Sequence, residues 1–487
     1  MTDTMQPSAR GARWRGARVA LAFAVLLQGC SAADKVSNAL LGIGSSRVPG
    51  QQGYVEGFLG GVAADEPRAV LAGRDVLSEG GTAADAAAAV ALTLAVTLPS
   101  RASLGGGGAC IAYFPSPKSA NRGVPEAVMF TPLAPAGTGA NADRPAAVPM
   151  MARGIFLLHA RYGSLPFEGI LASAEQLARF GVPVSRALAK DLALVPGPLL
   201  ADPGARAVFS LNGAVLTEGK TLRQPDLGGT LAQLRVSGVG DLYLGNLARR
   251  IESASDEIGG PIKLADLRRA LPKLAPVLSR DFHGDKVAFL PPPADGGLAA
   301  AGAFDILAGN PNDMAGAAAH ALAVAARYRA GGVTPEAALA AKGAPPAGVL
   351  YPASTGFVTM DRDGNVVTCA LTMDNLFGTG RIMPGVGILA AASPTAVTPP
   401  LLSAGVVWNP GMNAFRAAAS GSGQEGAPLA VAAALIDTLR TRQPMSVPVP
   451  EPGRANVIAC SDYLPGSKDS CGWAADPRSY GLAIGSN

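Results

Sequence analysis

The chain of 487 residues has few of the residues that carry metal or acid–base chemistry in many enzymes. Its three histidines, at positions 159, 283 and 320, are too scattered to offer the spacing of a metal site. Neither a G-x-S-x-G motif nor a suitably placed histidine supports a Ser-His-Asp triad. We therefore expect no metal and no cofactor.

Aromatic and charged residues are also scarce, at 5% and 16% of the chain, whereas glycine (61 residues) and alanine are abundant. The core should therefore be packed from small side chains. The net charge of +4 depends on residues 1–29, which hold four arginines and one aspartate; the remaining 36 basic and 35 acidic residues leave +1. Such a near-neutral chain without a basic run gives no reason to expect a nucleic-acid partner.

The N-terminus predicts export. Residues 1–30 place a cationic segment before the apolar run Val19–Leu27, which is too short to span a bilayer as a helix. The run ends in Leu27-Gln28-Gly29-Cys30, which resembles a bacterial lipobox. Cys30 is therefore expected to carry lipid and, through a tether of residues 31–56, to anchor the protein to the outer membrane, facing the periplasm. An ordinary secretory signal, which would release a periplasmic protein, is the alternative.

Four further cysteines remain in an exported chain, where disulfides can form and persist. Cys460 and Cys471 flank a short Pro/Gly loop, and we expect them to form a disulfide. Cys110 and Cys369 lie in apolar, strand-like runs and are expected to be buried thiols.

Helix signals are clear in the first third of the chain. Residues 65–80 read as a helix with Asp65 as its cap and Pro67 in its first turn. Thr82 is expected to cap the next helix, residues 83–98, which is apolar on almost every face and should be buried between layers. Gly105–Gly108 then lead into a strand at residues 109–114.

The most informative stretch is Ser354–Gly380, STGFVTMDRDGNVVTCALTMDNLFGTG. Two apolar runs around D-R-D-G-N predict a β-hairpin. Its first strand begins with the hydroxyls of Ser354 and Thr355, and the second strand brings Thr372 and Asp374 back toward them. A hydroxyl at a strand start with polar partners on the neighbouring strand is a candidate nucleophile, although such residues more often form a polar edge.

This stretch resembles the start of the small subunit of the γ-glutamyltransferase family, T-T-H-x-x-x-x-D-x-D-G-N-x-V-x-x-T-x-T-x-N-x-x-F-G. The family's nucleophilic threonine falls on Ser354, with Thr355 as the neighbouring fallback, and Gly356 replaces the histidine. Thr372 matches the threonine that holds the nucleophile, and Asp374 stands where asparagine is usual.

Other blocks support the same resemblance over roughly residues 57–435. The glycine run, including Gly106 and Gly107, matches the family's G-x-G-G-G-G block, whose backbone lies close to the nucleophile. Ser403 retains one of two hydroxyls that help bind the donor. Gly423, Gln424 and Gly426 stand for the loop whose amides contribute to the oxyanion hole.

The chain also departs from the family at the donor site. Thr131 occupies the position of the arginine that grips the donor's α-carboxylate, and a hydroxyl cannot imitate that bidentate clamp. Arg101 is an alternative source of charge, but the simpler interpretation is a solvated surface arginine. Ala390, Ala391 and Ala392 stand in place of the asparagines of a further motif. The chain is thus identified as a divergent member.

The resemblance implies an α+β fold, the four-layer αββα sandwich of N-terminal-nucleophile hydrolases. Residues 57–353 would form a large-subunit-like part and residues 354–447 a small-subunit-like part, followed by a C-terminal tail, 448–487, with the disulfide. Cleavage before Ser354 would expose an α-amine, whose ordinary pKa of about 7.7–8.0 lets it accept the hydroxyl proton without a histidine.

Two functions are compatible with these residues. In the first, which we favour, the chain is a self-processing amidohydrolase or transferase that acts on a γ-glutamyl or related amide and persists as a heterodimer of its own fragments. In the second, the scaffold is kept while the site has decayed, leaving a lipid-anchored binding or structural protein.

Overall fold

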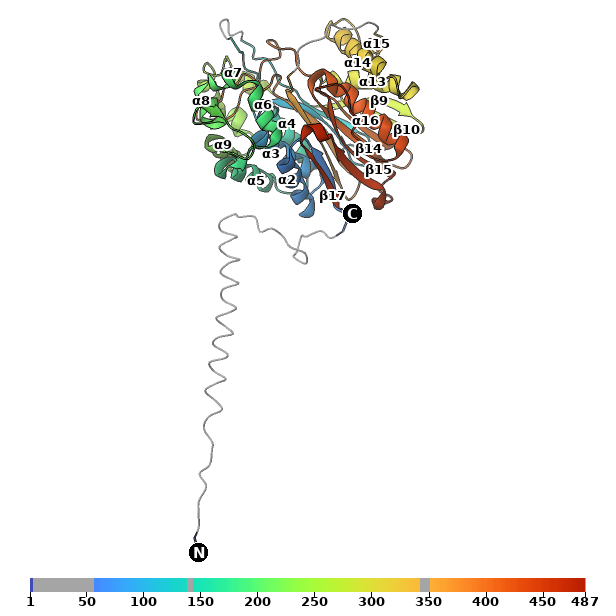
Figure 1. The fold of residues 1–487 in the computed structure, drawn as a ribbon, viewed down its shortest axis with the longest axis horizontal. Helices are drawn as coiled ribbons and strands as arrows, with labels where there is room; N and C mark the ends of the chain where they lie inside the picture. The colour runs from blue at the N-terminus through green and yellow to red at the C-terminus, as the bar shows by residue number, and fades with distance from the viewer. Residues whose placement is uncertain (3–56, 138–142, 342–350, 487) are drawn as a thin grey trace. The chain divides into compact units, whose positions relative to one another are not determined.

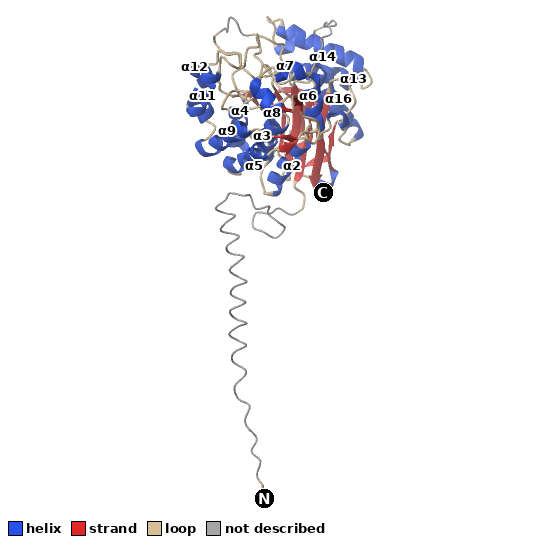
Figure 2. Ribbon diagram, turned by 60° about the vertical axis from the view of Figure 1, so that its left-hand side comes forward, coloured by secondary structure: helices blue, strands red, loops and turns tan. Residues whose placement is uncertain are grey.

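The computed structural model describes residues 1–2, 57–137, 143–341 and 351–486, and the part from residue 57 onward is built on two stacked antiparallel sheets. The predicted export signal, the tether and Cys30 lie outside the described residues. Helices cover the outer face of each sheet, so the order of layers is helix, sheet, sheet, helix (Figures 1 and 2). The predicted αββα sandwich is confirmed.

The first sheet has seven strands in the order β17-β1-β11-β12-β2-β3-β8. Its centre is the predicted hairpin, β11 and β12, which lies between β1 and β2. The strands, in chain order, are β1 (Gly60–Ala64), β2 (Gly107–Tyr113), β3 (Glu126–Phe130), β8 (Lys273–Pro276), β11 (Ser354–Asp361), β12 (Val366–Thr372) and β17 (Leu482–Ser486).

The second sheet has six strands in the order β16-β15-β14-β13-β10-β9. In chain order they are β9 (Leu278–Phe282), β10 (Asp285–Phe289), β13 (Ala404–Asn409), β14 (Ala414–Ser422), β15 (Arg454–Leu464) and β16 (Cys471–Ala475). Two small ribbons lie apart from the main sheets: β4 (Val182–Pro183) with β7 (Thr221–Leu222), and β5 (Ser210–Leu211) with β6 (Ala214–Val215).

The first sheet is covered by helices from the first part of the chain, and α2, α3 and α4 contact its strands directly. The helices of this part are α2 (Pro67–Ser78), α3 (Ala83–Thr97), α4 (Met151–Tyr162), α5 (Phe167–Phe180), α6 (Arg186–Leu194), α7 (Pro196–Leu200), α8 (Pro203–Phe209), α9 (Pro225–Ser237), α10 (Asp241–Leu244), α11 (Asn246–Ala254) and α12 (Leu264–Arg269).

The second sheet is covered by α13 and α16, with α14 packed against both. These helices are α13 (Gly296–Gly309), α14 (Met314–Arg329), α15 (Pro335–Ala338) and α16 (Ala427–Thr441). Apolar side chains fill the three spaces between the four layers, and alanine is frequent in each of them. Small side chains are thus a large part of the core, as expected, beside many leucine and valine side chains.

The predicted helix starts are correct to within one or two residues. Thr82 caps α3 through a capping box with Asp85, and all 15 residues of α3 are buried, as its all-round apolar pattern predicts. The cap of α2, however, is Glu66, whose carboxylate accepts from the Ala69 N–H at 2.9 Å. The prediction of Asp65 as this cap is wrong by one residue, and Asp65 contacts β11 instead.

Both pairs of cysteines form disulfides. Cys460–Cys471 is confirmed, and it joins facing residues of β15 and β16. Cys110 and Cys369 are fully buried as expected, but the prediction of free thiols is wrong because they are bonded to each other. The register of β2 and β12 places them directly opposite, with 4.1 Å between their Cα atoms. The two cysteines are 259 residues apart in sequence, so neither local run shows that their strands are adjacent.

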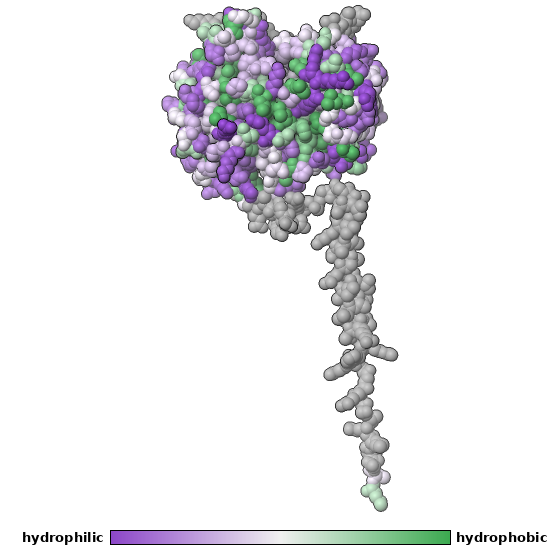
Figure 3. Space-filling view, turned by 180° about the vertical axis from the view of Figure 1, so that it is seen from behind, coloured by the Kyte–Doolittle hydropathy of each residue, from purple (hydrophilic) through white to green (hydrophobic). Residues whose placement is uncertain are grey.

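The C-terminal residues contribute to both sheets. β15 and β16 extend the second sheet beyond β14, and β17 pairs with β1 at the edge of the first. The strands within residues 448–486 are therefore part of the sandwich. Within the described residues, we find no helix with the length and hydropathy needed to cross a bilayer. Hydrophobic groups on one face of the surface are interrupted by hydrophilic side chains (Figure 3).

Candidate functional site

The head of the central hairpin positions the candidate nucleophile. Ser354 is the first residue of β11 and lies opposite Thr372, the last residue of β12. At the other end of the hairpin, Asp361 accepts hydrogen bonds from the turn residues Asp363 and Asn365 and from the Ala83 N–H of α3. Burial raises the pKa of Asp361 to about 6. The hairpin is therefore tied to its neighbours at both ends.

The side chain of Ser354 is buried, with 1% of its surface exposed. Its Oγ accepts a hydrogen bond from the Gly423 N–H at 3.2 Å. Gly423 has a φ of 94° at the end of β14, and a Cβ at this position would lie 1.9 Å from the carbonyl oxygen of Pro452. The loop 450–453 therefore fixes the backbone that faces the nucleophile, and it tolerates only glycine there.

The backbone of Ala353, the residue before Ser354, makes three hydrogen bonds, and two of them are on the carbonyl of the Ala353–Ser354 peptide bond. The Ala353 carbonyl oxygen accepts from Thr372 Oγ1 at 2.9 Å and from the Met373 N–H at 3.3 Å. The Ala353 N–H donates to Gln424 Oε1 at 3.3 Å. Two donors on one carbonyl beside a hydroxyl polarise the C=O bond and would stabilise an oxyanion formed on it. This arrangement suits attack on the Ala353–Ser354 bond.

The structure places the predicted loop and glycine residues as follows. Gly423 and Gln424 contact Ser354 and Ala353, whereas Gly426 lies in a short 3₁₀ turn against Gly453. Gly107 pairs with Thr372, and a Cβ on Gly106 would lie 2.3 Å from the Thr372 carbonyl oxygen. The close backbone approach that the glycine run predicts is therefore present beside Thr372.

Two predicted residues have their hydroxyls committed elsewhere. Thr355 Oγ1 donates to the buried carboxylate of Asp65 at 3.0 Å, so the structure does not support Thr355 as a fallback nucleophile. The hydroxyl of Ser403 donates to the carbonyl oxygens of Gly296 (2.9 Å) and Leu401 (3.0 Å) and is fully buried. The structure therefore gives Ser403 a role in the fold and no contact with Ser354.

Asp374 lies in the site but has an incomplete set of contacts. Its backbone N–H donates to Thr372 Oγ1 at 2.8 Å, which helps to aim that hydroxyl at Ala353. Its carboxylate Oδ2 is buried and has no hydrogen-bond partner among the described residues. Burial raises the pKa of Asp374 to about 8, against a smaller lowering effect of Arg329. The carboxyl is therefore largely protonated at neutral pH.

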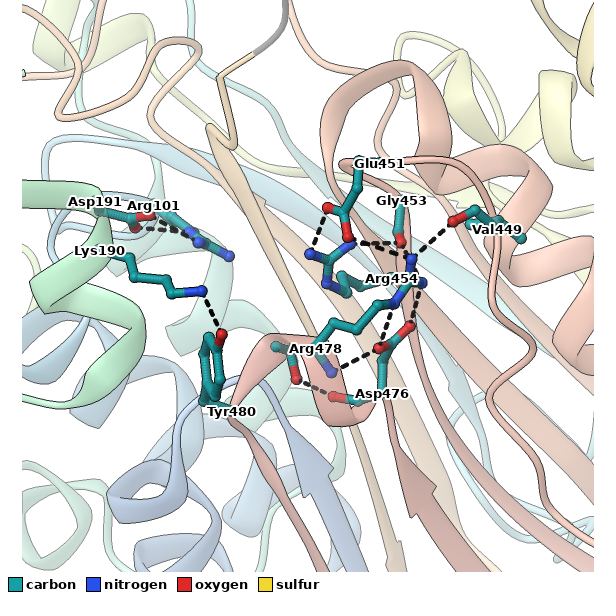
Figure 4. A network of polar contacts seen from close by, with 11 residues as sticks. Arg101, Lys190, Asp191, Val449, Glu451, Gly453, Arg454, Asp476, Arg478 and Tyr480 are labelled. Atoms are coloured by element: carbon teal, nitrogen blue, oxygen red, sulfur yellow. Dashed lines mark hydrogen bonds and ion pairs between the residues drawn. The ribbon is translucent and has the colours of Figure 1, made fainter. Parts of the chain in front are cut away.

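Arginines flank the site, but carboxylates hold them. Arg101 is 11% exposed and makes two hydrogen bonds of 2.8 Å to Asp191, so the expectation of a solvated surface arginine is wrong. Arg454 and Arg478 form a second cluster with Glu451 and Asp476 (Figure 4). Thr131, in place of the family's arginine, is partly buried at the end of β3. Among the described residues, we find no arginine that directly takes over the role of the family's arginine.

The site around Ser354 is distinct from a cavity elsewhere in the described residues. A cavity of about 770 Å³ lies between α8, the start of α9 and the loop 381–387, and its lining includes neither Ser354 nor its hydrogen-bond partners. Among the described residues, no group of three or more His, Cys, Asp or Glu side chains is arranged to hold a metal ion.

Sequence reasoning missed three contributors: the backbone N–H of Met373, and the side chains of Asp65 and Asn456, which contact the residues after Ser354. No local pattern marks Asp65 or Asn456, because their contacts join strands that are distant in sequence, whereas the Met373 N–H belongs to the predicted hairpin.

Comparison with known proteins shows a family model and several relatives that are similar to this chain. The family model "Gamma-glutamyltranspeptidase" matches residues 69–330. Glutathione hydrolase proenzyme of Escherichia coli is 30% identical over 384 residues, which cover 68% of this chain and 65% of the relative. Glutathione hydrolase 3 of Arabidopsis thaliana is 33% identical over 250 residues, covering 50% of this chain and 39% of the relative. The chain thus matches less than two thirds of the length of these relatives.

Solved structures support the fold over a longer range. Cephalosporin acylase from Bacillus halodurans superimposes with a TM-score of 0.71 and 20% identity, covering 91% of this chain and 98% of the acylase. The γ-glutamyltranspeptidase of Helicobacter pylori gives a TM-score of 0.51 at 23% identity, covering 60% of this chain and 90% of that one. With the family model matching more than half of its residues, the chain belongs to the γ-glutamyltranspeptidase family, within the N-terminal-nucleophile hydrolases.

Proposed function

We propose that this chain is a self-processing amidohydrolase or aminoacyltransferase that acts on a γ-glutamyl or related amide, with Ser354 as its nucleophile. One observation carries the proposal: the Ala353 carbonyl accepts hydrogen bonds from Thr372 Oγ1 and the Met373 N–H directly beside the buried hydroxyl of Ser354. The Met373 N–H continues the contacts between β11 and β12, and Thr372 Oγ1 adds a side-chain donor to the same carbonyl.

Self-cleavage follows from that geometry. Ser354 Oγ attacks the Ala353 carbonyl carbon, and Thr372 and Met373 stabilise the oxyanion. The carbon–nitrogen bond then breaks as the nitrogen gains the proton lost from the hydroxyl, so an ester replaces the amide. Water hydrolyses the ester, which leaves a carboxylate on Ala353 and a free α-amine on Ser354.

In the cleaved protein the new α-amine acts as the general base. It accepts the proton of its own residue's hydroxyl while Oγ attacks the substrate amide, and it returns that proton to the leaving amine. Water, or an acceptor amine, then releases the acyl group from Ser354. The backbone N–H of Gly423, 3.2 Å from Oγ, is the donor best placed to stabilise the substrate's oxyanion.

The substrate class rests on the relatives and on the departures of this chain. The relatives named above are glutathione hydrolases, and the solved structure that superimposes over most of the chain is a cephalosporin acylase. All three names imply amide or peptide substrates. The threonine at position 131 removes a carboxylate clamp, so the donor of this chain need not be a γ-glutamyl group. L-γ-Glutamyl p-nitroanilide carries the α-carboxylate and the α-amine, whereas butyryl p-nitroanilide lacks both. Release of nitroaniline from the first alone would support a γ-glutamyl donor, and release from the second would support another acyl group.

The alternative, a decayed site on a retained scaffold, is less well supported. The hydroxyl of Ser354 still accepts from the Gly423 N–H, and Thr372 still donates to the carbonyl of Ala353. A purified wild-type protein that stays uncut and hydrolyses no amide would favour this alternative.

Thr372→Val is expected to slow self-cleavage by about 100-fold, since removing one oxyanion donor costs about 10²–10³ in rate. Valine keeps the shape of threonine but cannot donate to Ala353 or accept from Asp374. The measurement is the fraction of cut chain over time after synthesis. Thr368→Val, a buried threonine on the same strand whose hydroxyl donates to the Ala419 carbonyl, is the matched control and should cleave at nearly the wild-type rate.

The two fragments are expected to stay covalently joined. Cys110 lies before the cleavage point and Cys369 after it, so their disulfide would link the fragments of the cut chain. Without reductant, gel electrophoresis should show one band, and N-terminal sequencing should find a second terminus at Ser354. With reductant, two bands should separate. Two bands without reductant would show that this disulfide is absent.

We also propose that the protein is exported and held to a membrane by lipid on Cys30, as its N-terminal sequence predicts. Incorporation of labelled palmitate by the wild-type protein and not by Cys30→Ala would support the anchor. Equal labelling of both, or labelling of neither, would contradict it.

A further inference from the structure

The first sheet is incomplete beside the nucleophile. β1 pairs with β11 only from Phe357 to Asp361, so the ladder between these two strands ends before Ser354. On the opposite side, β12 continues to pair as far as Ser354. Residues 354–356 therefore have a strand on one side only.

Two side chains satisfy the backbone where β1 ends. The Gly356 N–H donates to Asp65 Oδ2 at 3.3 Å, and the Gly356 carbonyl accepts from Asn456 Nδ2 at 2.8 Å. The same Asn456 nitrogen donates to Asp65 Oδ1 at 2.9 Å, and Thr355 Oγ1 donates to Asp65 Oδ2 at 3.0 Å. Asp65 and Asn456 thus take the place of the missing strand.

These contacts also tie the two sheets together. Asp65 directly follows β1 of the first sheet, whereas Asn456 lies on β15 of the second. The sheets approach closely here, because a Cβ on Gly356 would lie 2.2 Å from Ser420 Oγ. Asn456 pairs with Ser420, three residues before Gly423. The contacts of Asp65 and Asn456 therefore link the strand that begins with Ser354 to the strand that leads into the Gly423 loop.

Asp65 does not cap the neighbouring helix, so capping does not explain why its carboxylate is buried. Its side chain is fully buried, and the neighbouring Glu66 caps α2 instead. A buried carboxylate is costly unless hydrogen bonds compensate it, and all the described hydrogen bonds of Asp65 go to residues 355, 356 and 456. Arg101 lies within electrostatic reach and adds a favourable charge.

We propose that Asp65, together with Asn456, is a positioning residue for Ser354. The inference rests on the proposed function, because self-cleavage turns Ser354 into a chain end. Chain ends fray unless they are tied down, and catalysis requires reacting groups to be held close to their productive geometry. By binding Thr355 and Gly356, Asp65 and Asn456 hold the new N-terminal residue in place. No strand of the sheet lies beside residues 354–356 on the side where β1 has ended.

The test compares three variants with the wild-type protein. Asp65→Asn places an amide nitrogen against that of Asn456, and we expect kcat to fall by about 10–100-fold with KM little changed. Hydrogen exchange of peptides that cover residues 354–360 should become faster. Asn456→Asp opposes two carboxylates and should act similarly. The double variant restores one donor–acceptor pair and should recover part of the lost kcat.

Glu66→Gln is the matched control, since it alters a neighbouring buried carboxylate that does not contact β11. It should change neither kcat nor exchange at residues 354–360. Equal effects of Glu66→Gln and Asp65→Asn, or unchanged exchange in Asp65→Asn, would overturn the proposal. If the wild-type protein proves inactive, the proposed function fails, and the exchange measurement alone still decides whether Asp65 holds the head of β11.

Discussion

Replacing Ser354 by alanine is expected to leave the chain uncut and to lower amide hydrolysis by about four or more orders of magnitude, as for other enzymes that lose their nucleophile. The hydroxyl is the attacking group in both self-cleavage and substrate hydrolysis. Alanine removes only that oxygen from a buried side chain, so the fold should be kept. Intact mass, N-terminal sequencing and release of nitroaniline from the two anilides measure these outcomes.

Two variants serve as controls for this prediction. Ser354→Thr introduces the residue usual in the family and should still cleave before position 354. Thr355→Ala removes the hydroxyl bound to Asp65 and should leave the cleavage point unchanged. A break that persists in Ser354→Ala, or a new terminus at position 355 in the wild-type protein, would refute the assignment of the nucleophile.

The hairpin shows how far the sequence alone can lead. Two apolar runs around D-R-D-G-N indicate a turn between two strands, so β11, β12 and the approach of Thr372 to Ser354 were predictable. The motif that carries the family resemblance lies within this same hairpin. The fold class could therefore be inferred before any coordinates, and the same motif supplies Ser354 as the proposed nucleophile.

What the sequence could not supply are relations between distant strands. Whether Thr355 and Ser403 face the site depends on which neighbours their hydroxyls reach, and these neighbours, Asp65 and Gly296, are more than 100 residues away in sequence. The pairing of Cys110 with Cys369 likewise follows only from the register of two strands. Long-range register is set by the whole sheet and leaves no local signal.

Asp374→Asn is expected to stabilise the folded protein, and the gain should grow with pH. The pKa of Asp374 is about 8 in the folded protein because of burial, compared with an ordinary value of 3.8. Between these values the folded state binds a proton that the unfolded state has lost, so the stability of the wild-type protein falls as pH rises from about 4 to about 8. The full difference is at most about 5–6 kcal/mol, at 1.36 kcal/mol for each pH unit.

Asparagine has a similar shape and no charge, so Asp374→Asn removes this penalty. Denaturant unfolding of Ser354→Ala and of Ser354→Ala/Asp374→Asn, both uncut, should give equal free energies of unfolding near pH 4. By pH 9 the second protein should be more stable by several kcal/mol. A constant difference across this range would show that Asp374 does not titrate as its burial requires.

Asp85, a carboxylate whose pKa is lowered in the folded protein, is the control for the direction of the pH effect. Burial would raise the pKa of Asp85, but hydrogen bonds from His159, Thr82 and Ser164 hold it below its ordinary value. Its contribution to stability is therefore present above pH 4 and is lost as pH falls through its lower pKa in the folded protein. Asp85→Asn should destabilise the protein at neutral pH and lose that effect in acid, so the two substitutions diverge with rising pH. The Asp374 side chain would then be largely uncharged at neutral pH, as the family's asparagine is, and its charge would appear only in alkaline solution.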